Sequence, residues 1–286
     1  MKLWLEPFEH GFMLDAMMVG VVTGAMCAVL SCFLILKGWS LMGDAVSHAV
    51  LPGVVVAYWC GLPLMLGAFA AGLLCAAGSG YLKKHSRLKE DTAMGVVFTG
   101  MFGFGLVLFS KSGSDLHLDH VLVGDILGMS EPQVIRILWM GGLVLLASLL
   151  FRRDLLLICF DPQQAKIMGL REDLMTYSLL ALLSLSIVVA MQAVGVILVV
   201  AMLVIPGCVG YLWTDRFDRM LVISVVSSFV SVLVGIMVSY HANASTSGCM
   251  VLALTVAFVF SLLFAPKHGM RAKWRKSGDV RRQNMI

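Results

Sequence analysis

The chain has 286 residues, of which 59% are hydrophobic and only 13% are charged, with a formal net charge of +4. Ordinary soluble domains are about 45–50% apolar and about 25% charged, so this composition argues strongly against a soluble globular protein. We therefore predict an all-α, polytopic bundle of membrane-spanning helices. Residues 1–265 would form its single transmembrane domain, and residues 266–286 a basic, flexible tail.

Apolar runs recur along the whole chain, and most reach the roughly 17–25 residues that a helix needs to cross a bilayer. They cover residues 13–36, 46–59, 62–82, 92–109, 133–151, 174–190, 192–213, 220–240 and 247–265. The run at 46–59 is short, and the region 174–213 fits either two short helices or one long broken helix. The pattern predicts about nine spans, within a range of eight to ten.

The second apolar run begins with an unusual pair of ionisable residues. In GWSLMGDAVSHAVLPGV, residues 38–54, Asp44 and His48 are four positions apart. On a helix such residues share a face with their Cβ atoms about 5–6 Å apart, close enough to bind one ion together. A carboxylate with an imidazole suits Mn²⁺, Fe²⁺ or Zn²⁺. Ionisable groups within a membrane are costly and usually functional, so the pair is a candidate transport site.

Two structural alternatives to this metal site stay open. Asp44 could merely orient His48 through a hydrogen bond, or it could cap a helix that starts after Gly43. Pro52 has no N–H for the carbonyl of His48, so we expect a kink close to the pair.

Two ligands do not complete a metal site, so further ligands would have to come from elsewhere in the chain. The candidates are Asp125, Gln192 and His241, of which Asp125 and His241 are carried as the weaker metal-site residues. Asp125 interrupts the apolar decapeptide VLVGDILGMS, residues 121–130. Such a segment fits a short extracytoplasmic or re-entrant helix, which is tolerated where protein or water surrounds it.

A polar loop at residues 152–173 contains the signals of a short helix. Asp161 followed by Pro162 is a favourable helix start, and Gly169 is placed to end the helix. A capped helix of about residues 161–169 would offer a surface to a partner, or it could simply cover its own bundle. Further along, Pro206 and Gly207 predict a kink in the uncharged run 193–212.

The positions of Lys and Arg predict the orientation of the chain in the membrane. Eighteen of the 21 basic residues fall in clusters at Lys37, 83–89, 152–153, 166–171, 216–219 and 267–282. With nine spans all of these clusters lie on one side, which the positive-inside rule makes the cytoplasm. The N-terminus would then be outside and the C-terminus inside. The positive charge is thus a topology signal, not a nucleic-acid footprint.

The stretch GDAVSHAVLPGV strongly resembles the signature of the permease subunits of ABC metal-ion importers, which serve manganese, iron and zinc. VLVGDILGMS, FDPQQAKIMGL and AVGVILVVAMLVIP follow in the order expected for that family. The resemblance covers about residues 12–265. Within the family the chain is most similar to the Sit/Yfe-type manganese and iron permeases, and to their C component.

This resemblance implies a multi-pass permease of the bacterial inner membrane that works as a homodimer or heterodimer. Cytoplasmic ATPase subunits would supply ATP hydrolysis, and a periplasmic metal-binding protein would deliver the ion. The chain itself contains no G-x-x-x-x-G-K-[ST] motif and is not expected to be an enzyme. No permanently bound cofactor is implied, since the divalent metal is the cargo.

The resemblance also assigns roles to particular residues. Asp44 and His48 correspond to the family's proposed transport site. The loop from Asp161 to Gly169 corresponds to the helix that couples the permease to its ATPase, with Gln164 and Ala165 as further coupling residues.

Three alternatives differ in substrate or mechanism. The first is a zinc-specific ABC permease, and the second is a secondary transporter that couples metal to protons through the same pair. The third is a membrane metalloenzyme, against which the absence of an H-E-x-x-H motif counts.

Overall fold

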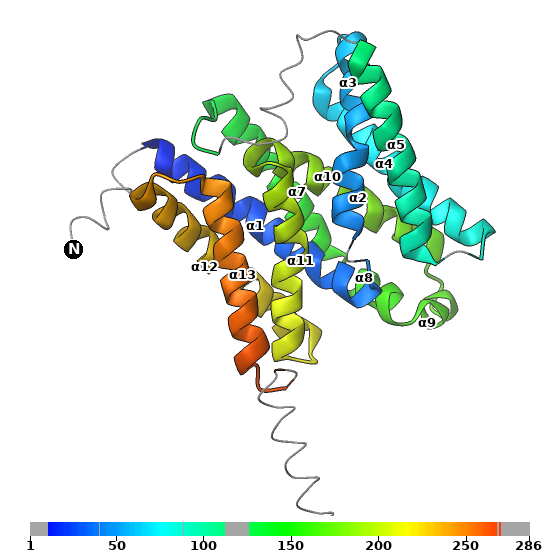
Figure 1. Ribbon diagram of the computed structural model, residues 1–286. Coiled ribbons are helices and arrows are strands. Elements are labelled where there is room, and N and C mark those ends of the chain that lie inside the picture. The colour runs from blue at the N-terminus through cyan, green and yellow to red at the C-terminus, as the bar shows by residue number, and fades with distance from the viewer. Residues whose placement is uncertain (1–10, 40, 88, 112–125, 268, 270–286) are drawn as a thin grey trace, which may run out of the picture.

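The computed structural model describes residues 11–39, 41–87, 89–111, 126–267 and 269, and these residues form an all-α bundle without strands (Figure 1). Eight helices are long and apolar enough to cross a membrane, with mean hydropathies between 1.5 and 2.6. They are α1 (Gly11–Lys37), α4 (Leu64–His85), α5 (Glu90–Lys111), α7 (Glu131–Leu150), α10 (Glu172–Val194), α11 (Val196–Trp213), α12 (Phe217–Ala242) and α13 (Thr246–Phe264). This confirms the membrane bundle, and the count lies within the predicted range.

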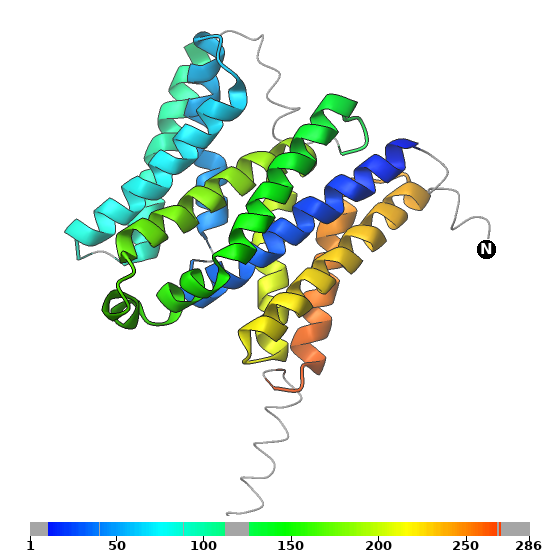
Figure 2. The same ribbon diagram turned by 180° about the vertical axis from the view of Figure 1, so that it is seen from behind.

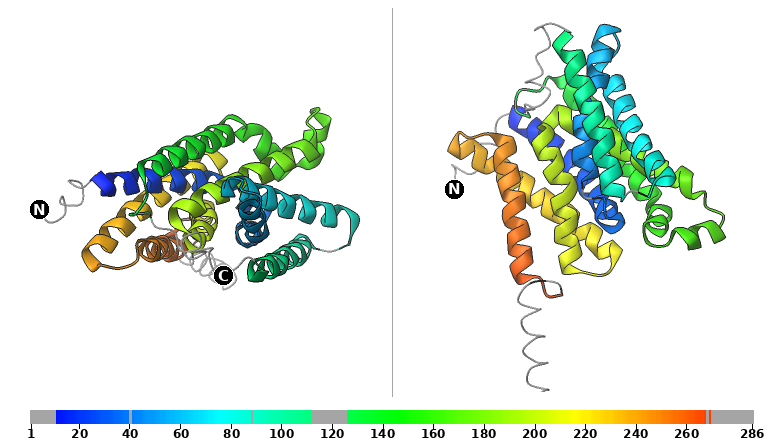
Figure 3. Two further views of the ribbon diagram at one scale, coloured as in Figure 1. Left: turned by 90° about the horizontal axis from the view of Figure 1, so that it is seen from above. Right: turned by 45° about the vertical axis from the view of Figure 1, so that its right-hand side comes forward.

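The short apolar run at 46–59 lies in two consecutive helices, α2 (Met42–Ala49) and α3 (Leu51–Trp59). Neither helix is long enough to span a bilayer alone, but the two helices, of 8 and 9 residues, rise together by about 26 Å. The pair lies beside α4 and α5 and follows their direction (Figures 1 and 3). Helix α1 begins at one end of the bundle and α13 ends at the other (Figure 1). An odd number of passes has this result, and the number is odd when α2 and α3 are counted together as one broken pass.

The break between α2 and α3 has a local cause and a packing cause. Pro52 has no N–H to donate to the carbonyl of His48, which a continuous helix would need. Helix α2 ends at Ala49, so the helix is interrupted close to the position where the kink was predicted. Helix α5 crosses this break at Gly105, where an added Cβ would lie 2.8 Å from Cδ of Pro52. The absence of a side chain at residue 105 therefore allows α5 to approach the break closely.

The region 174–213 forms two full-length spanning helices, α10 and α11, of 23 and 18 residues. They are separated at Gly195, whose φ of +79° favours glycine. Of the two alternatives, the structure shows two helices, and both are long enough to span a membrane.

The core of the bundle is built around α1, which lies between α7 and α12 when seen from behind (Figure 2). In the most apolar 18-residue window of α1, 72% of the residues are buried, compared with 17% in α5 and in α13. Helices α5 and α13 lie at the outer faces (Figure 3) and expose large apolar side chains, which a surrounding lipid phase would cover.

Some predicted features lie outside the described residues. Asp125 and the rest of 121–125 are among them, as is most of the tail, residues 270–286. The described part of the predicted re-entrant segment, residues 126–130, contains bends and no helix. The segment ends at Ser130, which with Gln133 forms a capping box at the start of α7.

Candidate functional site

Asp44 and His48 lie on one face of α2, as their spacing predicted. Atom Nε2 of His48 is 3.4 Å from Oδ1 of Asp44, and the two side chains are 38% and 44% exposed, respectively. Both residues are therefore held by a mostly buried helix while their polar atoms remain accessible. This arrangement leaves the oxygen and nitrogen atoms available to a further ligand.

The structure decides against one of the alternative roles of Asp44. The residue that precedes α2 is Leu41, and no side chain caps the helix there, so Asp44 is not its N-cap. Asp44 lies in the first turn and His48 in the last turn of this eight-residue helix. A negative charge in the first turn stabilises a helix, so Asp44 also supports α2. An orienting contact from Asp44 to His48 remains compatible with the 3.4 Å distance.

The surroundings of the pair come from α5 and from the break after α2. The ring of Phe102 in α5 meets the His48 imidazole edge to face, with 5.5 Å between the ring centroids. This contact restricts the imidazole orientation. His48 lies two residues before the break at Val50, near the middle of the element 42–59, and Asp44 lies about 6 Å nearer its start.

Two of the other predicted ligands, Gln192 and His241, are not gathered with this pair, and Asp125 lies outside the described residues. Helix α12, which carries His241 in its last turn, lies on the opposite flank of the bundle from α2 (Figures 1 and 3). Nδ1 of His241 is 2.9 Å from the Met237 carbonyl oxygen. Gln192 lines a separate cavity of about 380 Å³ together with Arg136. Among the described residues no group of three His, Cys, Asp or Glu side chains could hold a metal ion. The described part of one chain therefore brings together two candidate ligands, Asp44 and His48.

The predicted loop helix is present as α9 (Pro162–Ile167). Oδ1 of Asp161 accepts hydrogen bonds of 3.0 Å from the backbone N–H groups of Gln163 and Gln164, which confirms the N-cap. Gly169, with a φ of +81°, ends the helix. The N–H of Leu170 donates to the Ala165 carbonyl, which makes this end a Schellman motif.

Helix α9 projects from one end of the bundle (Figure 1). Two apolar side chains at its C-terminal end are exposed. Ile167 is 85% exposed and Met168 is 69% exposed, whereas Ala165 is fully buried. Gln164 is also exposed. Ala165 therefore packs α9 against its own bundle. Ile167 and Met168 form the outward apolar surface, which the sequence analysis missed. The signal for this surface in the sequence was the pair of apolar residues, Ile167 and Met168, directly before Gly169.

The basic clusters gather at the end of the bundle that carries α9. Lys37, Lys83, Lys84, Lys166 and Arg171 line one cavity there. The turn between α11 and α12 and the end of α13 lie at the same end (Figure 1), and Lys267 pairs with Asp215 between them. For the described residues, the predicted gathering of basic clusters on one side is confirmed.

Comparisons with known proteins agree with these features. A model of the ABC 3 transport family matches residues 9–265. The chelated iron transport system membrane protein YfeD of Yersinia pestis is 51% identical, over 91% of this chain and 87% of its own length. The manganese transport system membrane protein MntB of Synechocystis is also 51% identical, over 96% and 90% of the respective chains.

Two further comparisons refine the assignment. YfeC of Yersinia pestis is 39% identical over 95% of this chain and 92% of its own, so the D component is the more similar of the two Yfe proteins and the expected C component is not favoured. The solved structure of PsaBC from Streptococcus pneumoniae, in complex with Fab, superposes with a TM-score of 0.83 at 34% identity. That match covers 93% of this chain and 96% of the PsaBC chain.

The family match spans most of the chain and includes both α2 and α9, which carry the candidate site and the exposed loop helix. Membership of an ABC transport family sets aside the proton-coupled transporter and the metalloenzyme. The chain belongs to the ABC 3 transport family, as one of its membrane permeases.

Proposed function

We propose that this permease carries Mn²⁺ or Fe²⁺ across the bacterial inner membrane, with Asp44 and His48 as metal ligands on the path. The single observation that carries the proposal is the pair itself, because α2 holds a carboxylate and an imidazole 3.4 Å apart and part-exposed. Such a mixed oxygen and nitrogen pair suits borderline divalent ions. The similar proteins YfeD and MntB are named for iron and manganese, so zinc is not favoured.

A second permease chain would complete the metal site. The described part of one chain supplies two ligands to the site, and both side chains are partly open to the outside of the chain. A two-fold symmetric partner would bring the same pair to the axis, which doubles the ligands to four. A closely related permease chain with its own pair would serve equally well in a heterodimer.

The α9 end of the bundle is proposed to face the cytoplasm, since the basic clusters gather there. The N-terminus would then lie outside and the C-terminus inside. Cytoplasmic ATPase subunits would dock on Ile167 and Met168, which expose apolar surface at this end. A periplasmic metal-binding protein would deliver the ion at the opposite end of the bundle. No permanently bound cofactor is needed, because the metal is the substrate.

The chain connects the docking surface to the candidate site through few elements. Helix α9 leads directly into α10, and α10 packs against α2 and α4. A displacement of α9 by an ATPase would therefore move α10 against α2. Because α2 and α3 are already separate helices, α2 can tilt at the break without unfolding. Such a rigid-body shift would open the path alternately to the two sides.

Uptake of radioactive Mn²⁺ and Fe²⁺ tests the proposal directly. The complete transporter is produced in bacteria that lack their own manganese and iron importers. Asp44→Asn and His48→Gln are expected to lower uptake at least about tenfold each, because each removes one ligand while preserving side-chain size. Unlabelled Zn²⁺ should compete less well than Mn²⁺.

A matched control separates loss of the site from loss of the fold. His85→Gln removes an exposed imidazole that stacks on Tyr81 at the end of α4, away from α2, and should leave uptake unchanged. Membrane levels of all three variants are compared by immunoblot. Normal uptake by Asp44→Asn and His48→Gln at normal membrane levels would show that the pair is not the transport site.

A further inference from the structure

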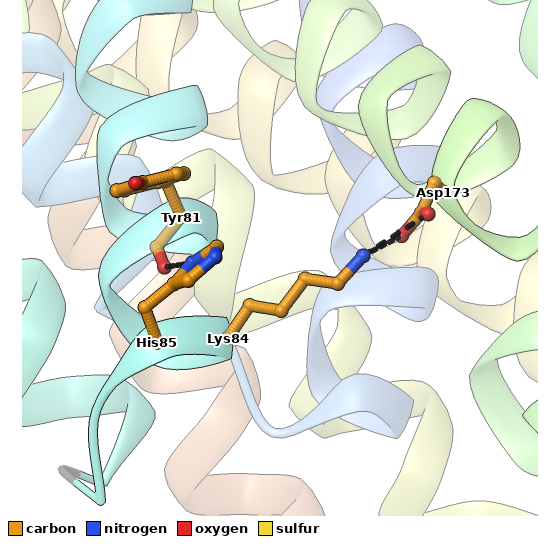
Figure 4. A network of polar contacts seen from close by, with 4 residues as sticks. All are labelled: Tyr81, Lys84, His85 and Asp173. Carbon is orange, nitrogen blue, oxygen red and sulfur yellow. Dashed lines mark hydrogen bonds and ion pairs between the residues drawn. The ribbon is translucent and has the colours of Figure 1, made fainter.

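His48 is one of three histidines among the described residues, and its imidazole is held differently from the other two. Nδ1 of His85 is 3.0 Å from the carbonyl oxygen of Tyr81, and Figure 4 shows this contact together with the stacking of the two rings. Nδ1 of His241 is 2.9 Å from the carbonyl oxygen of Met237. Each of these two imidazoles is therefore positioned by the carbonyl group four residues earlier in its own helix.

The corresponding carbonyl group in α2 is that of Asp44, and another side chain occupies it. The hydroxyl of Ser47 donates a hydrogen bond of 2.8 Å to this carbonyl oxygen. Among the described residues, the only polar contact of the His48 ring is the 3.4 Å approach of Nε2 to Oδ1 of Asp44. This distance is longer than the usual range for a hydrogen bond, so the contact does not by itself fix the ring.

A metal-binding histidine is normally oriented through its second ring nitrogen, whose N–H donates to a carboxylate or a backbone carbonyl. In the described part of the chain, His48 has no such partner for Nδ1. The contact that remains is with the ring of Phe102 in α5, at 5.5 Å between the ring centroids and 73° between the ring planes. Aromatic pairs prefer such edge-to-face arrangements, with centroids about 4.5–7 Å apart.

Phe102 is held in place by the packing of its own helix. Gly105, about one turn further along α5, lies where an added Cβ would be 2.8 Å from Cδ of Pro52. Helix α5 packs against both α2 and α3, and Phe102 itself is only partly exposed. The aromatic ring is thus anchored next to the break that follows His48, so it can limit the rotation of the imidazole.

We propose that Phe102 is a positioning residue for the metal site, which keeps Nε2 of His48 directed toward Oδ1 of Asp44 in place of the usual hydrogen bond. This inference rests on the proposed function of the Asp44 and His48 pair. A phenyl ring orients the imidazole without adding a ligand or a charge, and it does not raise the basicity of the imidazole as a carboxylate partner would. A transport site must release its ion as well as bind it, and orientation by an apolar ring gives such a site a moderate affinity.

Binding of Mn²⁺ to the purified permease with its ATPase subunits, in the absence of nucleotide, tests this role. Free Mn²⁺ is measured from its electron paramagnetic resonance signal, and a pulsed measurement detects the coupling of bound Mn²⁺ to an imidazole nitrogen. Phe102→Leu should weaken binding roughly tenfold and reduce the nitrogen coupling, because the imidazole no longer keeps one orientation. Phe102→Tyr keeps the aromatic ring and should retain both the affinity and the coupling.

Phe104→Leu is the matched control, because it removes the same kind of ring from the same helix. Phe104 is 58% exposed and has no aromatic partner among the described residues, so this variant should bind Mn²⁺ like the unmodified chain. Apparent melting temperatures of all variants separate a loss of affinity from unfolding. Phe102→Met fills a similar space without a ring, should behave like Phe102→Leu, and serves as the test if the Leu variant does not fold.

The outcomes separate this inference from the proposed function. If His48→Gln binds Mn²⁺ with unchanged affinity and nitrogen coupling, both the metal site and the role of Phe102 are overturned. If His48→Gln loses both but a folded Phe102→Leu or Phe102→Met binds Mn²⁺ like the unmodified chain, the metal site is retained and only the role of Phe102 is wrong. An equal loss in Phe102→Leu and Phe104→Leu would also overturn that role, because the effect would then come from α5 as a whole.

Discussion

The hydroxyl oxygen of Ser31 in α1 accepts a hydrogen bond of 2.9 Å from the backbone N–H of Gly207 in α11. The same hydroxyl donates to the carbonyl oxygen of Val204 at 3.2 Å. Pro206 lies between these two residues and removes one donor from the turn. The Ser31 side chain therefore supports α11 where proline disturbs it, and α11 remains one helix through the predicted kink site.

Ser31→Ala should lower the stability of the permease, because the N–H of Gly207 is left buried without this partner. The expected cost is about 1–3 kcal/mol, measured as a lower apparent melting temperature of the detergent-purified protein. Ser178→Ala is the matched control, since that hydroxyl bonds only to the Met175 carbonyl within its own helix. Equal melting temperatures for both variants would contradict the supporting role of Ser31.

Gly105→Ala should impair transport by displacing the break between α2 and α3. Its new methyl group would lie 2.8 Å from Cδ and 2.9 Å from the backbone nitrogen of Pro52, so α5 must move away. That movement would also carry Phe102 from the His48 ring. Gly103→Ala in the same helix meets no atom within 4 Å and should retain metal uptake. Similar uptake by both variants would show that the close approach of α5 is dispensable.

The exposed apolar face of α9 should be required for coupling to ATP hydrolysis. Ile167→Ser with Met168→Ser is expected to abolish metal-stimulated ATPase activity of the assembled transporter while leaving the permease folded, because both side chains are mostly exposed. Ile167→Leu with Met168→Leu keeps an apolar surface and should retain most of the activity. Full activity of the Ser double variant would place the docking surface elsewhere.

Cysteine labelling should report both the orientation and the burial of the chain. Cys60 is exposed at the end of α3, opposite the α9 end, so an impermeant maleimide should label it from outside intact spheroplasts. Burial raises the pKa of Cys159 to about 11, although the charge of Lys37 lowers it in part. At pH 7 only about one thiol in 10⁴ would be ionised there, so Cys159 should react slowly even in opened membranes.

The dependence of the Cys159 labelling rate on pH is the control for this experiment. In variants that retain one cysteine each, the rate at Cys159 should rise about tenfold per pH unit between pH 7 and pH 9, since the thiolate is the reactive form. Labelling of Cys60 only after the membrane is opened would reverse the proposed orientation.

The sequence by itself determined those features that depend on neighbouring residues. Long apolar runs predicted the membrane bundle, and four-residue spacing put Asp44 and His48 on one face. Asp161 and Gly169 marked the ends of α9, because capping and a left-handed backbone are local requirements. The resemblance carried by these motifs led to the right family.

Only the tertiary structure decided which distant segments meet. It put Phe102 and Gly105 against the candidate site, left His241 and Gln192 away from it, and buried Ala165 while exposing Ile167 and Met168. It also brought basic residues from α1, α4 and α9 around one cavity, together with Arg171 at the start of α10. These relationships arise from helix packing, in which a side chain's neighbours come from other parts of the chain, so no local pattern in the sequence could predict them.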